Sequence, residues 1–189
     1  MKTLKTLAIA LFAFTAVTAT AQSKKKVDVS KSKITWVGKK VTGEHSGTVN
    51  LRDGIFHFKG KELTGGSFTV DMNSITVTDL QAGQGKEKLE GHLKNDDFFA
   101  TDKFDTATLV FTSVSPKGKD TYNVKGDLTI KGKTNPVVFE VVVGANSAKT
   151  KFNIDRTKYD IKYGSGSFFD NLGDKAISDE FEVSAAIAF

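Results

Sequence analysis

The chain has 189 residues, of which 39% are hydrophobic and 26% charged, and it contains 15 Phe but no Cys. This length suits one domain and is too short for a typical TIM barrel of about 250 residues. The lack of Cys excludes disulfides, a thiol nucleophile and a Cys-ligated zinc or iron–sulfur site. The formal net charge is +5, but Arg, the residue suited to bidentate phosphate and base recognition, occurs only as Arg52 and Arg156. We therefore expect no nucleic-acid partner.

The first 21 residues have the three parts of a secretory signal peptide. Lys2 and Lys5 precede an apolar run over residues 7–17, and Ala19 and Ala21 are the small residues of a cleavage site. The run is much shorter than the ~20 residues that cross a membrane, so we expect no transmembrane anchor. Cleavage after Ala21 predicts a single mature domain over residues 22–189 and a periplasmic or secreted location.

The mature sequence is typical of short antiparallel strands separated by turn residues. Alternating apolar residues predict strands around residues 34–37, 47–51, 55–58, 67–72, 108–114, 122–130, 137–143, 151–154 and 181–189. Asp53-Gly54 is a strong hairpin dipeptide and predicts a turn between the second and third of these strands. The last strand has the clearest period, because its apolar residues share one face: Phe181, Val183, Ala185, Ile187 and Phe189.

One segment departs from the strand period. Leu89 and Leu93 lie four residues apart among Lys and Glu, which predicts one or two turns of amphipathic helix over residues 86–94. Residues 164–174 form a second irregular stretch. About eight antiparallel strands with one short helix predict an all-β fold, a barrel or a sandwich. An eight-stranded barrel is either filled by side chains or holds one small ligand.

The residues that could carry chemistry are scattered. His45, His57 and His92 each lack a second His within five residues. Gly132-Lys133-Thr134 lacks the upstream Gly of a phosphate-binding loop and precedes a strand, so it predicts a turn. We therefore expect no metal, no cofactor and no enzymatic activity. The positive signal is apolar, since two Phe pairs lie in irregular segments and either fill the core or close a cavity: Phe98-Phe99 and Phe168-Phe169.

An ordered set of motifs covers nearly the whole mature chain and resembles the YceI-like family. The motifs are Gly43-Glu44-His45-Ser46-Gly47, Gly65-Gly66-Ser67-Phe68, Asp71-Met72-Asn73-Ser74-Ile75, residues 89–99, Phe111-Thr112-Ser113-Val114, residues 126–137, and Asp155-Arg156 with Tyr159. Many members have Arg-Asp just before the His-Leu pair, where this chain has Glu90-Gly91.

The resemblance implies an extended, lipocalin-like antiparallel β-barrel that binds a polyisoprenoid or another lipid chain in its interior. It also implies a periplasmic or secreted protein and raises a homodimer as an expectation. By analogy the ligand-binding lining is expected to contain Trp36, Phe68, Met72, Ile75, Phe98, Phe99, Phe111, Phe139, Phe168 and Phe169. Leu89 and Leu93 would pack the helix against the barrel.

Three functions remain to be separated. The first is a carrier or storage protein for a long apolar chain such as a polyisoprenoid, an isoprenoid quinone or a fatty-acid derivative. The second is a structural or interaction domain whose barrel is fully packed. The third is an enzyme acting on a lipid head group through Glu44, His45 or His92, which requires these side chains to converge at the mouth of the barrel.

Overall fold

The computed structural model describes residues 21–189, so the predicted signal peptide lies outside the described residues except for Ala21. The described part contains nine strands, one α-helix and two short 3₁₀-helices. In chain order these are β1 (Gln22–Lys26), β2 (Asp28–Lys40), β3 (Gly43–Lys59), β4 (Glu62–Val77), α1 (Lys86–Lys94), β5 (Thr106–Gly118), β6 (Thr121–Ile130), β7 (Lys133–Val143), β8 (Ser147–Asp155), η1 (Arg156–Tyr159), η2 (Gly173–Lys175) and β9 (Ile177–Ala188).

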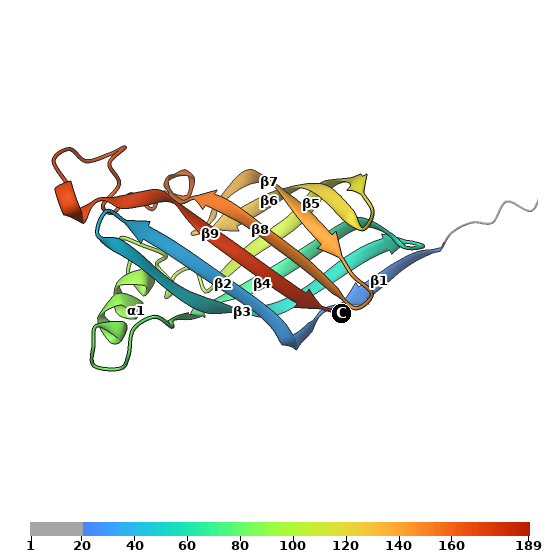
Figure 1. Ribbon diagram of the computed structural model, residues 1–189, viewed down its shortest axis with the longest axis horizontal. Helices are drawn as coiled ribbons and strands as arrows, with labels where there is room; N and C mark the ends of the chain where they lie inside the picture. Colours follow the sequence, from blue (N-terminus) through green and yellow to red (C-terminus); the bar gives the residue numbers. More distant parts are fainter. Residues whose placement is uncertain (1–20) are drawn as a thin grey trace, which may run out of the picture.

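Eight of the strands close into an antiparallel barrel. Hydrogen-bonded neighbours follow the order β3-β2-β9-β8-β7-β6-β5-β4, and β4 pairs with β3 again. The short β1 pairs with residues 55–59 of β3, and β2 pairs with residues 43–49, so β1 extends the barrel wall beyond β2 (Figure 1). The prediction of an all-β barrel of about eight strands with one short helix is confirmed.

The alternation within each strand sets the two faces of the wall. In β6 the side chains that turn inward are Tyr122, Val124, Leu128 and Ile130, while the residues between them are exposed or half-buried. The predicted apolar face of β9 also turns inward, since Phe181, Val183, Ala185 and Ile187 all reach the barrel interior.

The predicted hairpin turn at Asp53-Gly54 is wrong. Both residues lie within the continuous strand β3 and pair with Thr69 and Phe68 of β4, next to a register shift. A Cβ on Gly54 would lie 2.6 Å from Cδ1 of Phe68, so this glycine makes room for an aromatic ring in the core. The chain reverses instead on either side of β3, at residues 41–42 and 60–61. The local turn signal was overridden by long-range strand pairing, which often decides strand structure.

The helix prediction is confirmed, and α1 covers one end of the barrel (Figure 1). Leu93 is buried and Leu89 packs at the edge of the same apolar cluster. Oε1 of Glu90 accepts a hydrogen bond of 2.8 Å from the backbone N–H of Val77, which ties the helix to the end of β4. The chain therefore makes a polar helix–barrel contact at a position where it departs from the common motif.

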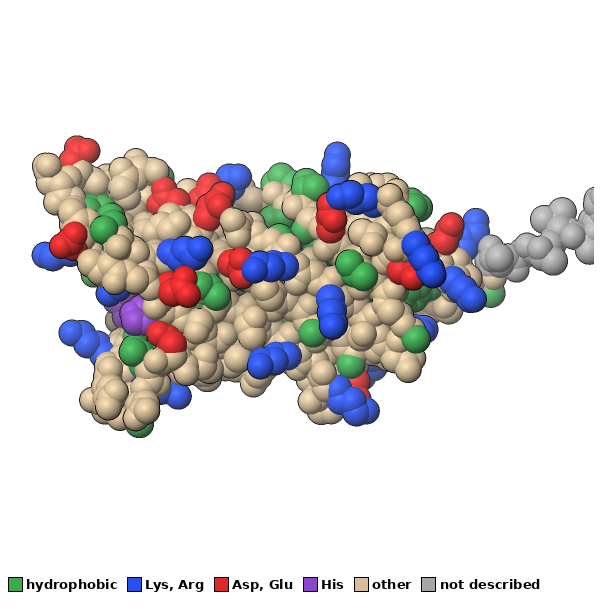
Figure 2. Space-filling model, viewed as in Figure 1, with side chains coloured by type: hydrophobic (Ala, Val, Ile, Leu, Met, Phe, Trp, Pro, Cys, Tyr) green, Lys and Arg blue, Asp and Glu red, His purple; other side chains and the backbone are tan. Residues whose placement is uncertain are grey.

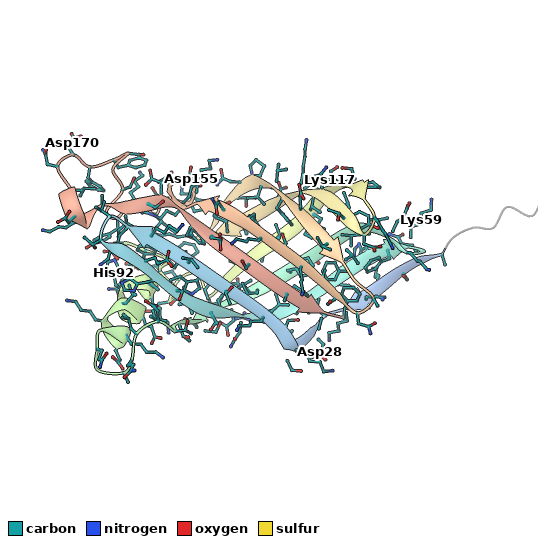
Figure 3. The ribbon with its side chains drawn as sticks, in the orientation of Figure 1. Asp28, Lys59, His92, Lys117, Asp155 and Asp170 are labelled. Atoms are coloured by element: carbon teal, nitrogen blue, oxygen red, sulfur yellow. The ribbon has the colours of Figure 1, made fainter. Side chains whose placement is uncertain are left out.

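The core has two parts, one toward each end of the barrel. Toward the end marked by Lys59 and Lys117 in Figure 3, Phe rings cluster, and the ring centroids of Phe56 and Phe189 lie 5.1 Å apart. Toward the end marked by His92, which we call the helix end, the buried residues include Leu93, Phe98 and Phe99.

Candidate functional site: an apolar cavity inside the barrel

A cavity of about 200 Å³ lies between the two parts of the core, and its wall is almost entirely apolar. Residues from all eight barrel strands and from α1 contribute to the wall, because each strand turns every second side chain inward. Eight of the ten residues predicted as lining are part of this wall: Trp36, Phe68, Met72, Ile75, Phe98, Phe99, Phe111 and Phe139. Their contact with a ligand stays a prediction.

Phe168 and Phe169 do not line the cavity, which corrects the prediction made by analogy. The two side chains are 49% and 50% exposed in the segment between η1 and η2. The backbone N–H groups of both residues bond to the carbonyl of Ser165, which is itself buried, and this turn directs the rings outward. Nζ of Lys162 lies 5.0 Å from the centroid of the Phe168 ring. Asp170 marks this segment in Figure 3, at the helix end.

Aromatic rings form a continuous band along one side of the cavity. The ring centroids of Phe68 and Phe111 are 5.4 Å apart, and those of Phe111 and Phe139 are 5.7 Å apart. Phe139 stacks on Phe152, with centroids at 4.5 Å and an angle of 17° between the ring planes. Sequence reasoning placed Phe152 in a strand but did not assign it to the lining. The inward faces of the neighbouring strands β7 and β8, considered together, could have identified it.

The indole of Trp36 packs closely over Gly47 on the neighbouring strand, which is possible because this glycine has no side chain. A Cβ at Gly47 would be 2.5 Å from Cζ2 of Trp36 and 1.8 Å from the backbone oxygen of Thr76. Steric contact therefore explains why the first family motif ends in a glycine, Gly47. Within the described chain, the buried indole Nε1 of Trp36 has no hydrogen-bond partner.

Arg156 is another residue of the cavity wall that the sequence did not predict. It contributes to the cavity wall at the helix end, and its side chain is 2% exposed. The guanidinium carbon lies 5.9 Å from the centroid of the Phe98 ring. Burial lowers the pKa of Arg156, and the nearby carboxylates of Asp179 and Asp155 oppose this shift. Since arginine stays protonated in proteins, the structure holds a buried positive charge beside an apolar cavity.

The guanidinium of Arg156 ties together both ends of the segment that carries Phe168 and Phe169. Its Nη1 donates to the carbonyls of Ile161 and Tyr163 at 2.8 and 2.9 Å. Its Nε and Nη2 donate to the carbonyls of Ser178 and Ile177 at 2.9 and 3.0 Å. No local sequence pattern predicts this role, because the partners are backbone carbonyls, and those of Ile177 and Ser178 lie more than twenty residues after Arg156 in the chain.

Near Arg156, the pKa values of the Asp179 carboxyl and the Tyr159 phenol are both shifted away from neutral pH. The hydroxyls of Ser165 and Ser167, with the charge of Arg156, hold the pKa of Asp179 below its ordinary value. Oδ1 of Asp179 lies 3.6 Å from Nη2 of Arg156. Burial raises the pKa of Tyr159 to about 12, with a smaller contribution from Asp155. At neutral pH the region therefore contains an ion pair and a neutral phenol.

The candidate catalytic side chains are not part of the cavity wall. Nδ1 of His45 lies 2.8 Å from Oδ2 of Asp79, while His92 packs against the rings of Phe98 and Tyr163. Glu44 is exposed. Although burial opposes the shift, hydrogen bonds from the backbone of Ser46 and from His45 lower the pKa of Asp79. None of Glu44, His45 and His92 reaches the cavity.

The outer surface carries the charges of the chain. Lys and Arg side chains alternate with Asp and Glu over the face shown in Figure 2, without a continuous basic stripe. Across residues 21–189, no helix has the length and apolar character needed to cross a membrane. The same part of the chain contains no group of three or more metal-ligating side chains.

An eight-stranded antiparallel barrel around an apolar cavity is the architecture of small-ligand-binding barrels such as the lipocalins. The family model of the YceI-like domain matches residues 26–189, and the chain belongs to this family.

Sequence relatives cover one part of the chain. It is 36% identical over 94 residues to a UPF0312 protein of Shewanella denitrificans, a match that covers 50% of this chain and 47% of the relative. Protein YceI of Escherichia coli is also 36% identical over 94 residues, with 50% and 46% covered. The match spans about half the length of these curated relatives.

Two solved structures share the fold. BcnA of Burkholderia cenocepacia superposes with a TM-score of 0.66 at 23% identity, over 86% of this chain and 99% of BcnA. A polyisoprenoid-binding domain from Saccharophagus degradans superposes with a TM-score of 0.57 at 14% identity, over 86% and 95% of the two chains. These likenesses extend over nearly the whole barrel.

The positions of Phe98 and Phe168 predict losses of stability of different size. Phe98 is 8% exposed and contacts His92 and Phe99, so Phe98→Ala should lower the free energy of unfolding by about 3 kcal/mol. Phe168→Ala should lower it by less than about 1 kcal/mol, because half of that ring is already exposed. Urea unfolding followed by circular dichroism measures both values, and equal losses would contradict the placement of Phe168 outside the core.

Proposed function

We propose that this protein binds one long apolar chain, such as a polyisoprenoid, an isoprenoid quinone or a fatty-acid derivative, inside the barrel and acts as its carrier or store. The observation that carries the proposal is the apolar cavity enclosed by the strands. Each buried CH₂ group of a ligand contributes ~0.8 kcal/mol, so a site without catalytic groups can bind such a chain tightly. The binding needs no metal or cofactor.

The comparisons support the same class of ligand. The chain belongs to the YceI-like family, and a fold neighbour from Saccharophagus degradans is a polyisoprenoid-binding domain. The signal-peptide pattern of residues 1–21 supports a periplasmic or secreted location. A homodimer remains an expectation from the family resemblance, which light scattering of the purified protein would test.

The two alternatives have less support. A fully packed structural barrel does not account for a cavity of about 200 Å³. Enzymatic action on a head group has no support from the cavity wall, because Glu44, His45 and His92 lie elsewhere.

Native mass spectrometry of the protein purified from the periplasm tests the proposal. We expect a bound species with the mass of a prenyl or acyl lipid, which organic extraction removes. We also expect the delipidated protein to take up geranylgeraniol at a ratio of one per chain. A protein that carries no lipid and takes up neither a prenyl nor an acyl chain would contradict the proposal.

A further inference from the structure

The charges around the cavity restrict the ligand further. Three charged residues contribute atoms to the wall: Lys149, Arg156 and Glu180. Lys149 and Glu180 are exposed on strands β8 and β9, next to the inward-facing Ala148 and Phe181, so their charged groups lie outside the barrel. Nδ2 of Asn153 donates to Oε2 of Glu180 on this outer side. Among residues 21–189, Arg156 is therefore the one charged side chain buried at the cavity.

The guanidinium of Arg156 is already paired with groups of the protein itself. Four of its five N–H groups donate to backbone carbonyls at 2.8–3.0 Å, and Oδ1 of Asp179 lies 3.6 Å from Nη2. Asp179 balances the positive charge, while its Oδ2 accepts a hydrogen bond from the hydroxyl of Ser167. A carboxylate or phosphate inside the cavity would find no unpaired cation in the described wall.

The residues at the two ends of the cavity determine where the head group of a ligand can lie. At the helix end the cavity wall contains Leu93, Phe98 and Arg156. At the other end Phe56 packs on Phe58 and Phe189, with centroids at 6.2 and 5.1 Å. A ligand seated between these groups has its head group inside the barrel. Burying an ionised head group without a partner is strongly unfavourable.

From these contacts we infer that the cavity selects long-chain ligands with an uncharged head group, such as an alcohol, ester, amide or quinone, over carboxylates and phosphates. The inference rests on the proposed function. It names the ligand class that the apolar wall alone leaves open.

Matched ligand pairs test this selectivity in the full mature chain. Geranylgeraniol is compared with geranylgeranyl phosphate, and methyl oleate with oleate, by isothermal titration at pH 8 below the critical micelle concentrations. We expect the uncharged member of each pair to bind at least about tenfold more tightly. Equal or tighter binding of the phosphate and carboxylate would overturn the inference and leave the proposed function intact. If no member of either pair binds, both the proposed function and the inference fail.

A variant pair locates the cause of the selectivity. Asp179→Asn removes the carboxylate that balances Arg156, so oleate should gain affinity while methyl oleate keeps its wild-type value. Asp174→Asn is the matched control, because Asp174 is exposed in η2 of the same segment. If oleate does not gain affinity in folded Asp179→Asn, the pairing of Arg156 is not what excludes anions. If Asp179→Asn does not fold, the wild-type ligand pairs decide the inference by themselves.

Discussion

Replacing Arg156 by methionine should lower the free energy of unfolding by about 3–5 kcal/mol, the typical cost of removing one partner from a buried charged network. The variant keeps the apolar stem of the side chain but leaves four buried or half-buried carbonyls without their donor. Each unsatisfied group carries a desolvation penalty of about 1–3 kcal/mol, although solvent reaching the segment would recover part of it. It also leaves the carboxylate of Asp179 without its cation.

Chemical denaturation with urea measures the loss, and two variants control for it. Arg156→Lys should recover only part of the stability, because an ammonium group has three donors and lacks the planar fork of arginine. Arg52→Met should cost less than about 1 kcal/mol, since Arg52 is exposed and its pair with Asp105 lies on the surface. Similar losses for Arg52→Met and Arg156→Met would show that the buried network contributes nothing particular.

The sequence predicts those parts of the fold that depend on local patterns. The spacing of Leu89 and Leu93 gives the correct bounds of α1, because the period of a helix is visible within nine residues. The alternation in β9 likewise identifies its inward face. The family resemblance supplied the barrel fold, and this fold brings eight of the ten predicted lining residues together around one cavity.

The errors arise where distant residues decide. Asp53-Gly54 has the composition of a turn, but Gly54 is needed inside β3 so that Phe68 can pack over the strand. Phe168 and Phe169 are apolar residues in an irregular segment, and only the turn at Ser165 shows that they face outward. The role of Arg156 depends on carbonyls from the turn that follows η1 and from β9. Contacts of this kind produce no repeating pattern of apolar residues in the sequence, so they cannot be predicted from it.

Filling the cavity should weaken ligand binding strongly while the protein stays folded. Ala185 on β9 lines the cavity between Ile34 of β2 and Thr150 of β8, so Ala185→Phe places a ring where the proposed ligand lies. We expect its affinity for geranylgeraniol to fall by at least about tenfold. The free energy of unfolding should change by no more than about 1–3 kcal/mol, because the ring occupies existing space before it strains the wall.

The neighbouring residue provides the matched control for this variant. Ala186 has the same side chain on the same strand but points outward and is exposed, so Ala186→Phe adds an identical ring outside the barrel. We expect Ala186→Phe to bind geranylgeraniol as the wild type does, measured by titration and by native mass spectrometry. Full binding by folded Ala185→Phe would place the ligand outside the cavity, and loss of binding in both variants would attribute the effect to β9 rather than to the filled space.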